Sequence, residues 1–194
     1  MFFARAAARP MDIKSTNIAG VAVIKPSRHF DSRGHFVETY NERAFRAAGI
    51  SASFVQDNLS FSLKRGTIRG LHFQLPPSSQ AKLVRVVRGS IFDVAVDLRA
   101  RSPTYGRWVG QHLTAAEGEQ MFIPAGLAHG FCTLEPNTEI AYKVDAYYAP
   151  ECDSGLIWND PVLGINWPVA PEDVVLSERD GELGRFSQFD SPFQ

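Results

Sequence analysis

The sequence predicts an all-β protein, a sandwich or barrel with a few short helices. About nine to eleven short apolar or alternating segments follow one another, separated by turn signals roughly every 8–12 residues, as in β-sandwiches and barrels. The 12 Pro and 15 Gly residues supply those turns. The pattern lacks the regularly alternating helices that a parallel α/β sheet would need.

Length and composition favour one domain with a substantial core. The chain has 194 residues, of which 44% are hydrophobic and 21% are charged, and its net charge is −1. No basic block stands out, so nucleic acid is not an expected partner. No apolar run approaches the roughly 18–20 residues of a membrane span, so a membrane is not an expected partner either.

Two features bear on location and domain boundaries. The two cysteines, Cys132 and Cys152, belong to no C-x-x-C pair and are expected to be free thiols in a reducing cytoplasm. Met1–Pro10 contains Ala and Arg but no acidic residue, and it resembles a targeting peptide only faintly. We expect residues 1–10 to be a disordered extension of a single domain that spans residues 11–194.

The first part of that domain is expected to contain strands and one helix. Gly20–Pro26 predicts a strand, Asp31–Gly34 predicts a turn because Asp and Gly favour one, and His35–Tyr40 alternates like a strand. Asn41–Gly49 predicts a helix, since Asn is a good N-cap and Gly commonly follows the last helical residue. Phe54–Asn58 predicts another short strand.

The central stretch, Gly66–Gln74, predicts a strand entered from a turn. Side chains alternate along a strand, so Ile68, Gly70, His72 and Gln74 are expected on one face. His72, beside a glycine, could be a base, a metal ligand or a hydrogen-bonded core residue. This segment alone leaves the three possibilities open.

The rest of the chain continues the β pattern. Lys82–Arg88 and Ile91–Leu98 predict a hairpin around a two-residue turn at Gly89-Ser90. A turn at Pro124–His129 separates two later strands, and Leu176–Gly181 predicts a short final helix. The remaining expected strands are Trp108–Leu113, Gln120–Ile123, Gly130–Leu134 and Thr138–Asp145.

Two histidine spacings resemble the two motifs of the cupin superfamily. Gly66-x5-His72, with Gly89 downstream, resembles the first motif, and Gly118-x5-Pro124-x-Gly126-x2-His129 resembles the second. The resemblance implies a cupin jelly roll with both histidines near one end of the barrel. Metal-binding cupins usually carry a second His and a Glu soon after the first His, where this chain has Gln74 and then Ser78 and Ser79. Two histidines make a poor site for a divalent metal, so no metal is expected.

A closer resemblance extends from about Met11 to Arg185. Many short stretches occur in the order and spacing of the dTDP-4-dehydrorhamnose 3,5-epimerase family, to which the chain is similar. They are Asp31-Ser-Arg-Gly-His-Phe-Val-Glu38, Phe54-Val-Gln-Asp-Asn58, Ile68-Arg-Gly-Leu-His-Phe-Gln-Leu-Pro76, Lys82-Leu-Val-Arg85, Phe92-Asp-Val-Ala-Val-Asp97, Ser102-Pro-Thr-Tyr-Gly-Arg-Trp108, Ile123-Pro-Ala-Gly-Leu-Ala-His-Gly-Phe131, Tyr142-Lys143, Trp158-Asn-Asp-Pro161 and Leu176-Ser-Glu-Arg-Asp180.

This resemblance implies an enzyme that inverts C3 and C5 of dTDP-4-dehydro-6-deoxy-D-glucose to give dTDP-4-dehydro-L-rhamnose. Inverting a carbon next to a ketone requires a base on one face, an acid on the other, and positive charge or a donor at the carbonyl oxygen. No cofactor is expected, because the ketone itself accepts the electron pair.

The resemblance also implies four catalytic residues. His72 is the base and Asp180 orients it, although Ser177-x-x-Asp180 would also suit a helix cap. Tyr142 is the acid, although a core tyrosine is the alternative. Lys82 stabilises the enolate oxygen, unless it is an ordinary solvated residue at a strand end.

Further residues would bind the substrate. By the resemblance, His129 contacts substrate or supports the enolate, and a structural turn histidine is the alternative. Strict alternation points Arg69 away from His72, so either Arg69 serves another part of the site or the strand is irregular. Candidates for the diphosphate are Arg33, Arg69 and Arg179, the last at a position where the family most often has Lys. Positions that contact substrate in the family are Glu38, Gln56, Asn58 and Asp153.

The resemblance implies a homodimer in which the N-terminal segment of one subunit joins the partner's sheet and site. Three other functions remain open. The first is a relative that epimerises only C3 or C5, or isomerises the ketone, of a related dTDP-4-keto-deoxysugar. The second is a metal-dependent cupin enzyme. The third is a nucleotide-sugar binder without catalysis.

Overall fold

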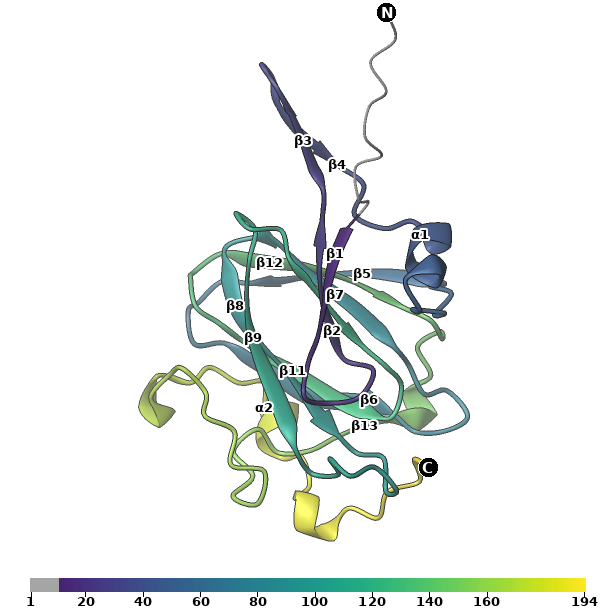
Figure 1. Ribbon diagram of the computed structural model, residues 1–194. Helices are drawn as coiled ribbons and strands as arrows, with labels where there is room; N and C mark the ends of the chain where they lie inside the picture. Colours follow the sequence, from purple (N-terminus) through teal and green to yellow (C-terminus); the bar gives the residue numbers. More distant parts are fainter. Residues whose placement is uncertain (1–10) are drawn as a thin grey trace, which may run out of the picture.

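Two antiparallel sheets face each other and enclose the centre of the molecule (Figure 1). The computed structural model describes residues 11–194, so the expectation about Met1–Pro10 lies outside the described residues. The six-stranded sheet has the order β1 (Met11–Ser15), β2 (Ala22–Pro26), β10 (Gln120–Ile123), β7 (Lys82–Arg88), β12 (Thr138–Val144) and β5 (Gln56–Ser62). The five-stranded sheet has the order β13 (Asp153–Gly155), β6 (Ile68–Gln74), β11 (Leu127–Thr133), β8 (Ser90–Asp97) and β9 (Trp108–Thr114).

The remaining elements are short. A hairpin of β3 (Arg28–Asp31) and β4 (Gly34–Val37) projects beyond the sheets at the top of Figure 1. The helices are α1 (Glu42–Ala47), α2 (Glu178–Gly181) and 3-10 turns at Pro150–Cys152, Pro171–Asp173 and Phe186–Gln188. This architecture confirms the expected all-β jelly roll with a few short helices.

The core has three hydrophobic clusters, one between the sheets and one on the outer face of each. Ile140 and Phe131 belong to the inner cluster, which both sheets line. The helix α1 covers the six-stranded sheet with Phe45, whose burial is worth about 1.5–3 kcal/mol. The C-terminal segment covers the five-stranded sheet. Consequently β8 is buried at every position.

Two helix caps follow from the sequence as expected. The Asn41 side chain accepts a hydrogen bond from the backbone N–H of Ala44 at the start of α1. The Ser177 side chain caps α2 in the same way, through the N–H of Asp180. Each cap satisfies a backbone donor that the helix itself leaves unpaired.

The expected hairpin around Gly89-Ser90 is wrong. The strand β7 pairs with β10 and β12, whereas β8 pairs with β9 and β11 in the other sheet. The chain therefore crosses between the sheets at Gly89, which has a φ of +81°. A Cβ there would lie 2.5 Å from the Thr138 side-chain oxygen, so the corner requires glycine.

The expected face of β6 is partly wrong, because the strand is irregular. His72 lies opposite His129, but Arg69, three residues away, lies opposite Phe131, only two residues away. One extra residue in β6 forms a β-bulge, so Ile68 packs in the outer cluster rather than beside His72. A Cβ on Gly70 would lie 2.6 Å from the Cα of Gly130, so the two strands approach closely there.

The predicted turn at Pro124–His129 ends earlier than expected. The strand β11 begins at Leu127, so His129 lies within a strand and not in a turn. Strand alternation places His129 on the same face as Leu127 and Phe131, both members of the inner cluster.

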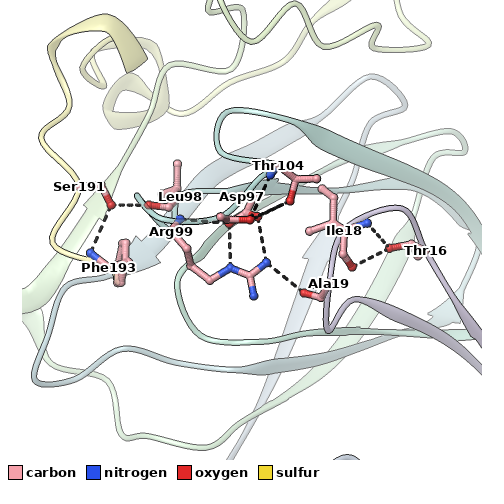
Figure 2. A network of polar contacts seen from close by, with 10 residues as sticks. Thr16, Ile18, Ala19, Asp97, Leu98, Arg99, Thr104, Ser191 and Phe193 are labelled. Carbon is pink, nitrogen blue, oxygen red and sulfur yellow. Dashed lines mark hydrogen bonds and ion pairs between the residues drawn. The ribbon is translucent and has the colours of Figure 1, made fainter.

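A buried carboxylate closes the end of β8 (Figure 2). The Asp97 side chain is fully buried and accepts hydrogen bonds from the Arg99 guanidinium and the Ser102 and Thr104 hydroxyls, at 2.6–2.9 Å. Arg99 also donates to the carbonyl of Ala19, which links the loop to the β1–β2 connection. Burial opposes ionisation of Asp97, but these donors outweigh it and lower its pKa to about 2.

Cys132 and Cys152 are both free thiols, as expected, and both are buried. None of the helices in residues 11–194 has the length and hydrophobicity needed to cross a bilayer.

Candidate active site

An open cleft lies at one end of the space between the sheets. It consists of two adjoining hollows of about 340 and 300 Å³, and both are lined by His72, Lys82, Tyr142 and Arg179. The five-stranded sheet contributes His72, and the six-stranded sheet contributes Lys82 and Tyr142. The larger hollow is also lined by Gln56, Asn58, Gln74, Gln80, Tyr148 and Asp153, and the smaller one by Ser60, Arg69, His129, Phe131, Ser177 and Asp180.

His72 is held by a carboxylate from the C-terminal part of the chain. Its Nε2 lies 2.6 Å from Oδ1 of Asp180, which is 4% exposed. The other Asp180 oxygen accepts a hydrogen bond from the Gly70 N–H at 3.4 Å. Burial favours the neutral acid, but the hydrogen bond to His72 and those from Gly70 and Ser177 lower the pKa of Asp180.

This geometry separates the two roles considered for Asp180. The Ser177 hydroxyl and the Asp180 backbone N–H form the cap of α2. The Asp180 carboxylate does not complete a capping box and is directed to His72 instead. The short helix therefore places an anion beside the imidazole.

A second histidine–carboxylate pair lies on the neighbouring strands. His129 Nε2 is 2.7 Å from Oδ1 of Asp93, and neither side chain is more than 8% exposed. Burial lowers the pKa of His129, although the adjacent Asp93 opposes this effect. His129 lies in a strand rather than in a turn, and it lines the smaller hollow with His72.

Lys82 is a buried cation rather than a solvated strand end. The residue is 9% exposed, and its Nζ donates to the carbonyl oxygen of His72 at 3.2 Å. Burial lowers its pKa to about 8, against the opposing attraction of Asp93 and Asp153. Lys82 can therefore lose its charge at mildly alkaline pH.

Tyr142 lines the cleft from β12. It packs at the edge of the inner cluster, on the same face as Ile140, as the alternation predicted. Burial raises the pKa of Tyr142, while Arg69 opposes the rise. The phenol therefore keeps its proton at neutral pH and can act as a donor.

The larger hollow has a polar wall of hydrogen-bonded side chains. Gln56 donates to Asn58 at 2.9 Å and accepts from the Tyr148 N–H at 3.1 Å. Asp153 pairs with Arg179 at 2.7 Å and accepts from the Tyr148 hydroxyl at 3.0 Å. The Arg179 side chain is 52% exposed, so it remains accessible to a ligand.

The irregularity of β6 explains why Arg69 and His72 line the same hollow. The bulge brings Arg69 and His72 to the same hollow, although strict alternation would separate them. The Arg69 guanidinium contacts the Ser62 hydroxyl at 3.3 Å and donates to the Phe61 carbonyl at 3.0 Å.

Two expected site residues, Arg33 and Glu38, do not reach this cleft. Arg33 lies at the tip of the β3–β4 hairpin and pairs with Asp31 at 2.6 Å. Glu38 is exposed just after β4. Neither residue lines either of the two hollows.

Sequence reasoning missed several residues of the site. Asp93 was one of them, and its signal was a single acid in the otherwise apolar stretch 91–96 of a strand. Ser60 was another, and its hydroxyl is buried without a hydrogen-bond partner among the described residues. Ser60 could have been found from the sequence because Gln56, Asn58 and Ser60 are polar residues at alternate positions, which share one face of a strand. Gln80 and Ser177 were also missed.

Gln74, which stands where metal-binding cupins have a histidine, has a structural role. Its amide nitrogen donates to the carbonyls of Ser78 and Tyr147, and its oxygen accepts from the Ala149 N–H. Within residues 11–194, no group of three or more His, Cys, Asp or Glu side chains is arranged to hold a metal ion.

Comparison with known proteins finds extensive similarity. A family model described as dTDP-4-dehydrorhamnose 3,5-epimerase matches residues 15–188. The dTDP-4-dehydrorhamnose 3,5-epimerase of Sinorhizobium fredii is 49% identical over 184 residues, which cover 95% of this chain and 94% of the relative.

Solved structures agree with the sequence comparison. The dTDP-4-dehydrorhamnose 3,5-epimerase of Bacillus anthracis, with TDP and PPi bound, has a TM-score of 0.87 and 47% identity over 90% of this chain and 99% of that chain. The dTDP-6-deoxy-D-glucose-3,5-epimerase of Legionella pneumophila, in complex with dTDP-4-keto-L-rhamnose, has a TM-score of 0.89 and 41% identity over 95% and 98% of the two chains.

Proposed function

This chain belongs to the dTDP-4-dehydrorhamnose 3,5-epimerase family, and we propose how it performs that reaction. The isomerase inverts C3 and C5 of dTDP-4-dehydro-6-deoxy-D-glucose and yields dTDP-4-dehydro-L-rhamnose. Both carbons flank the C4 ketone, which accepts the electron pair without a cofactor. The observation that carries the proposal is the His72–Asp180 pair on one wall of a cleft that Tyr142 lines from the other sheet.

His72 is the base. The Asp180 carboxylate can only accept a hydrogen bond, so Nε2 of His72 carries the proton in that bond. Nδ1 then keeps its lone pair and takes the proton from C3 or C5. The C–H electron pair moves into the carbonyl and forms an enolate, while Asp180 stabilises the imidazolium.

Tyr142 is the acid. Its phenol, which burial keeps protonated, delivers a proton to the opposite face of the same carbon. The enolate collapses back to the ketone with inverted configuration. Exchange with solvent then returns His72 to the neutral form and Tyr142 to the phenol, and the cycle repeats at the second carbon.

Lys82 stabilises the enolate oxygen. Lys82 has three N–H donors, of which the carbonyl of His72 uses one. His129 lies opposite His72 in the sheet and lines the same hollow, where it contacts the substrate. In a partly dry cleft, a fixed cation opposite the developing charge is worth more than in water.

The nucleotide part of the substrate binds toward the larger hollow. Arg179 lines both hollows and Arg69 lines the smaller one, so the diphosphate binds where the two hollows adjoin. Guanidinium groups match phosphate oxygens in pairs. Gln56, Asn58 and Asp153, which form the polar wall, orient the rest of the substrate. We assign Arg179 the role that lysine most often fills in the family.

We also propose that residues 11–194 form one catalytic domain that works as a homodimer in the cytoplasm. Phe30 and Phe36 on the projecting hairpin are 74% and 71% exposed, and Leu59 on the edge strand β5 is 65% exposed. Such surfaces and unpaired strand edges are normally covered. The hairpin of one subunit carries Arg33 to the partner's cleft, and Glu38 accompanies it.

Incubating the full chain with the 4-keto sugar nucleotide in D2O tests the function. Deuterium at both C3 and C5, with the product identified by NMR, supports the double epimerase. Label at one carbon indicates a single-site relative, and a ketone moved along the ring indicates a ketoisomerase. Binding without label indicates a nucleotide-sugar binder. Activity lost to a chelator and restored by metal indicates a metal-dependent enzyme.

A further inference from the structure

The carboxylate of Asp93 is an anomaly in the inner core. Asp93 is fully buried on β8, on the same face as Ile91 and Ala95 of the inner cluster. Its Oδ1 lies 2.7 Å from His129 Nε2, but its Oδ2 has no hydrogen-bond partner among the described residues. A buried oxygen without a hydrogen-bond donor lowers the stability of a native protein, so its presence requires an explanation.

The surrounding charges suggest that explanation. Asp93 contacts His129 on its neighbouring strand, and His129 lines the same hollow as Lys82 on β7. The charge of Asp93 opposes the lowering of the Lys82 pKa by burial. His72 on β6 also acts on His129, and Asp153 on β13 also acts on Lys82. On the other neighbouring strand, β9, the residue paired with Asp93 is the neutral Gln111.

We propose that Asp93 is a positioning residue for the epimerisation. One oxygen of Asp93 accepts the hydrogen bond that holds His129 in the Nε2–H tautomer. The other oxygen has no donor, so its negative charge remains available to keep Lys82 protonated. This inference rests on the proposed action of Lys82 at the C4 oxygen and on the proposed contact of His129 with the substrate. Asp93 itself stands behind His129 and does not touch the substrate.

The arrangement leaves Lys82 free to act. A lysine buried without an anion loses its proton readily, whereas a nearby carboxylate favours the charged form. The Asp93 oxygens take no hydrogen bond from Lys82, whose single described bond goes to the His72 carbonyl. Lys82 therefore keeps its charge and two donors for the enolate oxygen.

The variant Asp93→Asn tests this role in the full-length enzyme. The amide has nearly the same shape and still accepts a hydrogen bond from His129, but it carries no charge. Without the anion the pKa of Lys82 falls, so the alkaline limb of the kcat/KM profile should move about one pH unit lower. At pH 8 we expect a loss of about fivefold in kcat with a smaller change in KM, and a smaller loss at pH 6.5.

Asp97→Asn is the matched control. Asp97 lies on the same strand and is equally buried, but it binds Arg99, Ser102 and Thr104 outside the cleft. We expect a lower thermal stability for this variant and an unchanged pH profile. An identical shift of the alkaline limb in both variants would assign the effect to lost stability and overturn the inference.

A measurement on the unmodified enzyme keeps the inference testable if Asp93→Asn does not fold. The ¹⁵N shifts of the histidine rings should identify His129 as the Nε2–H tautomer at neutral pH. An Nδ1–H tautomer, or an Asp93→Asn enzyme with an unshifted alkaline limb, would overturn the role of Asp93. Failure of the unmodified enzyme to incorporate deuterium would instead overturn the proposed function.

Discussion

His72 and His129 are a cross-strand pair on β6 and β11, and the Nε2 of each lies against a carboxylate, at 2.6 and 2.7 Å. The two environments differ in access to water. The side chain of His72 is 30% exposed, whereas that of His129 is 8% exposed. Only His72 lies where its ring can exchange a proton with solvent in each turnover, so the two histidines have different expected phenotypes.

Replacement of His72 by Asn should lower kcat by about 10²–10⁴-fold, since that is the usual contribution of a general base. Deuterium incorporation from D2O should fall at C3 and C5 together. The matched variant His129→Asn should keep both exchanges, more slowly, because the base remains. Equal loss of exchange in the two variants would contradict the assignment of His72 as the base.

Replacement of Tyr142 by Phe should separate proton removal from inversion. His72 can still abstract and return a proton on its own face, so solvent deuterium should enter the substrate. Without the phenol on the other face, the configuration at the labelled carbons should be retained. NMR of the recovered sugar nucleotide measures both properties. Normal inversion by Tyr142→Phe would remove this residue from the mechanism.

Lys82 should set the alkaline limit of activity. The pKa of Lys82 is lowered to about 8, so the charge that stabilises the enolate is present below pH 8 and is lost as the pH rises through 8. The variant Lys82→Arg should move the alkaline limb of the activity profile to higher pH, since guanidinium keeps its proton. The variant Lys82→Met should lose this limb together with most of kcat. Profiles of kcat/KM between pH 6 and 10 provide the measurement, and an unmoved limb in Lys82→Arg would count against Lys82.

Asp97 should contribute stability that depends on pH. Its pKa is about 2 in the folded state and 3.8 as the reference value, so the contribution is complete above pH 3.8 and is lost as the pH falls toward 2. A difference of this size corresponds to roughly 2 kcal/mol. Denaturant unfolding of Asp97→Asn and the unmodified protein at pH 7 and pH 3 should show a difference that narrows in acid. A difference independent of pH would exclude the charged form as its source.

Complementation should reveal whether the hairpin acts in the partner's cleft. Arg33→Ala and His72→Asn should each be impaired, because each removes a part of every site. Mixing and refolding the two variants should restore about a quarter of the normal sites, since half of the dimers are mixed and each of these has one complete site. Activity after mixing is the measurement. An unchanged sum of the two activities would mean that Arg33 acts within its own subunit or not at all.

Local features of this protein could be predicted from sequence because they depend on neighbouring residues. The cap at Asn41, the strand at Gln120–Ile123 and the inward face of Tyr142 follow from short-range hydrogen bonding and period-two alternation. The pairing of His72 with Asp180 joins residues far apart in the chain, so only the resemblance to a family predicted it before the structure placed them 2.6 Å apart.

The sequence by itself determined most of the strands, the all-β class and, through its motifs, the family. The tertiary structure alone decided that Gly89 crosses between sheets, that a bulge sets Arg69 beside His72, and that Asp93 stands behind His129. The physical reason is that alternation specifies which side a residue takes but not which strand becomes its neighbour. Strand pairing and register depend on packing both faces of a sheet at once, and this requires contacts between distant parts of the chain.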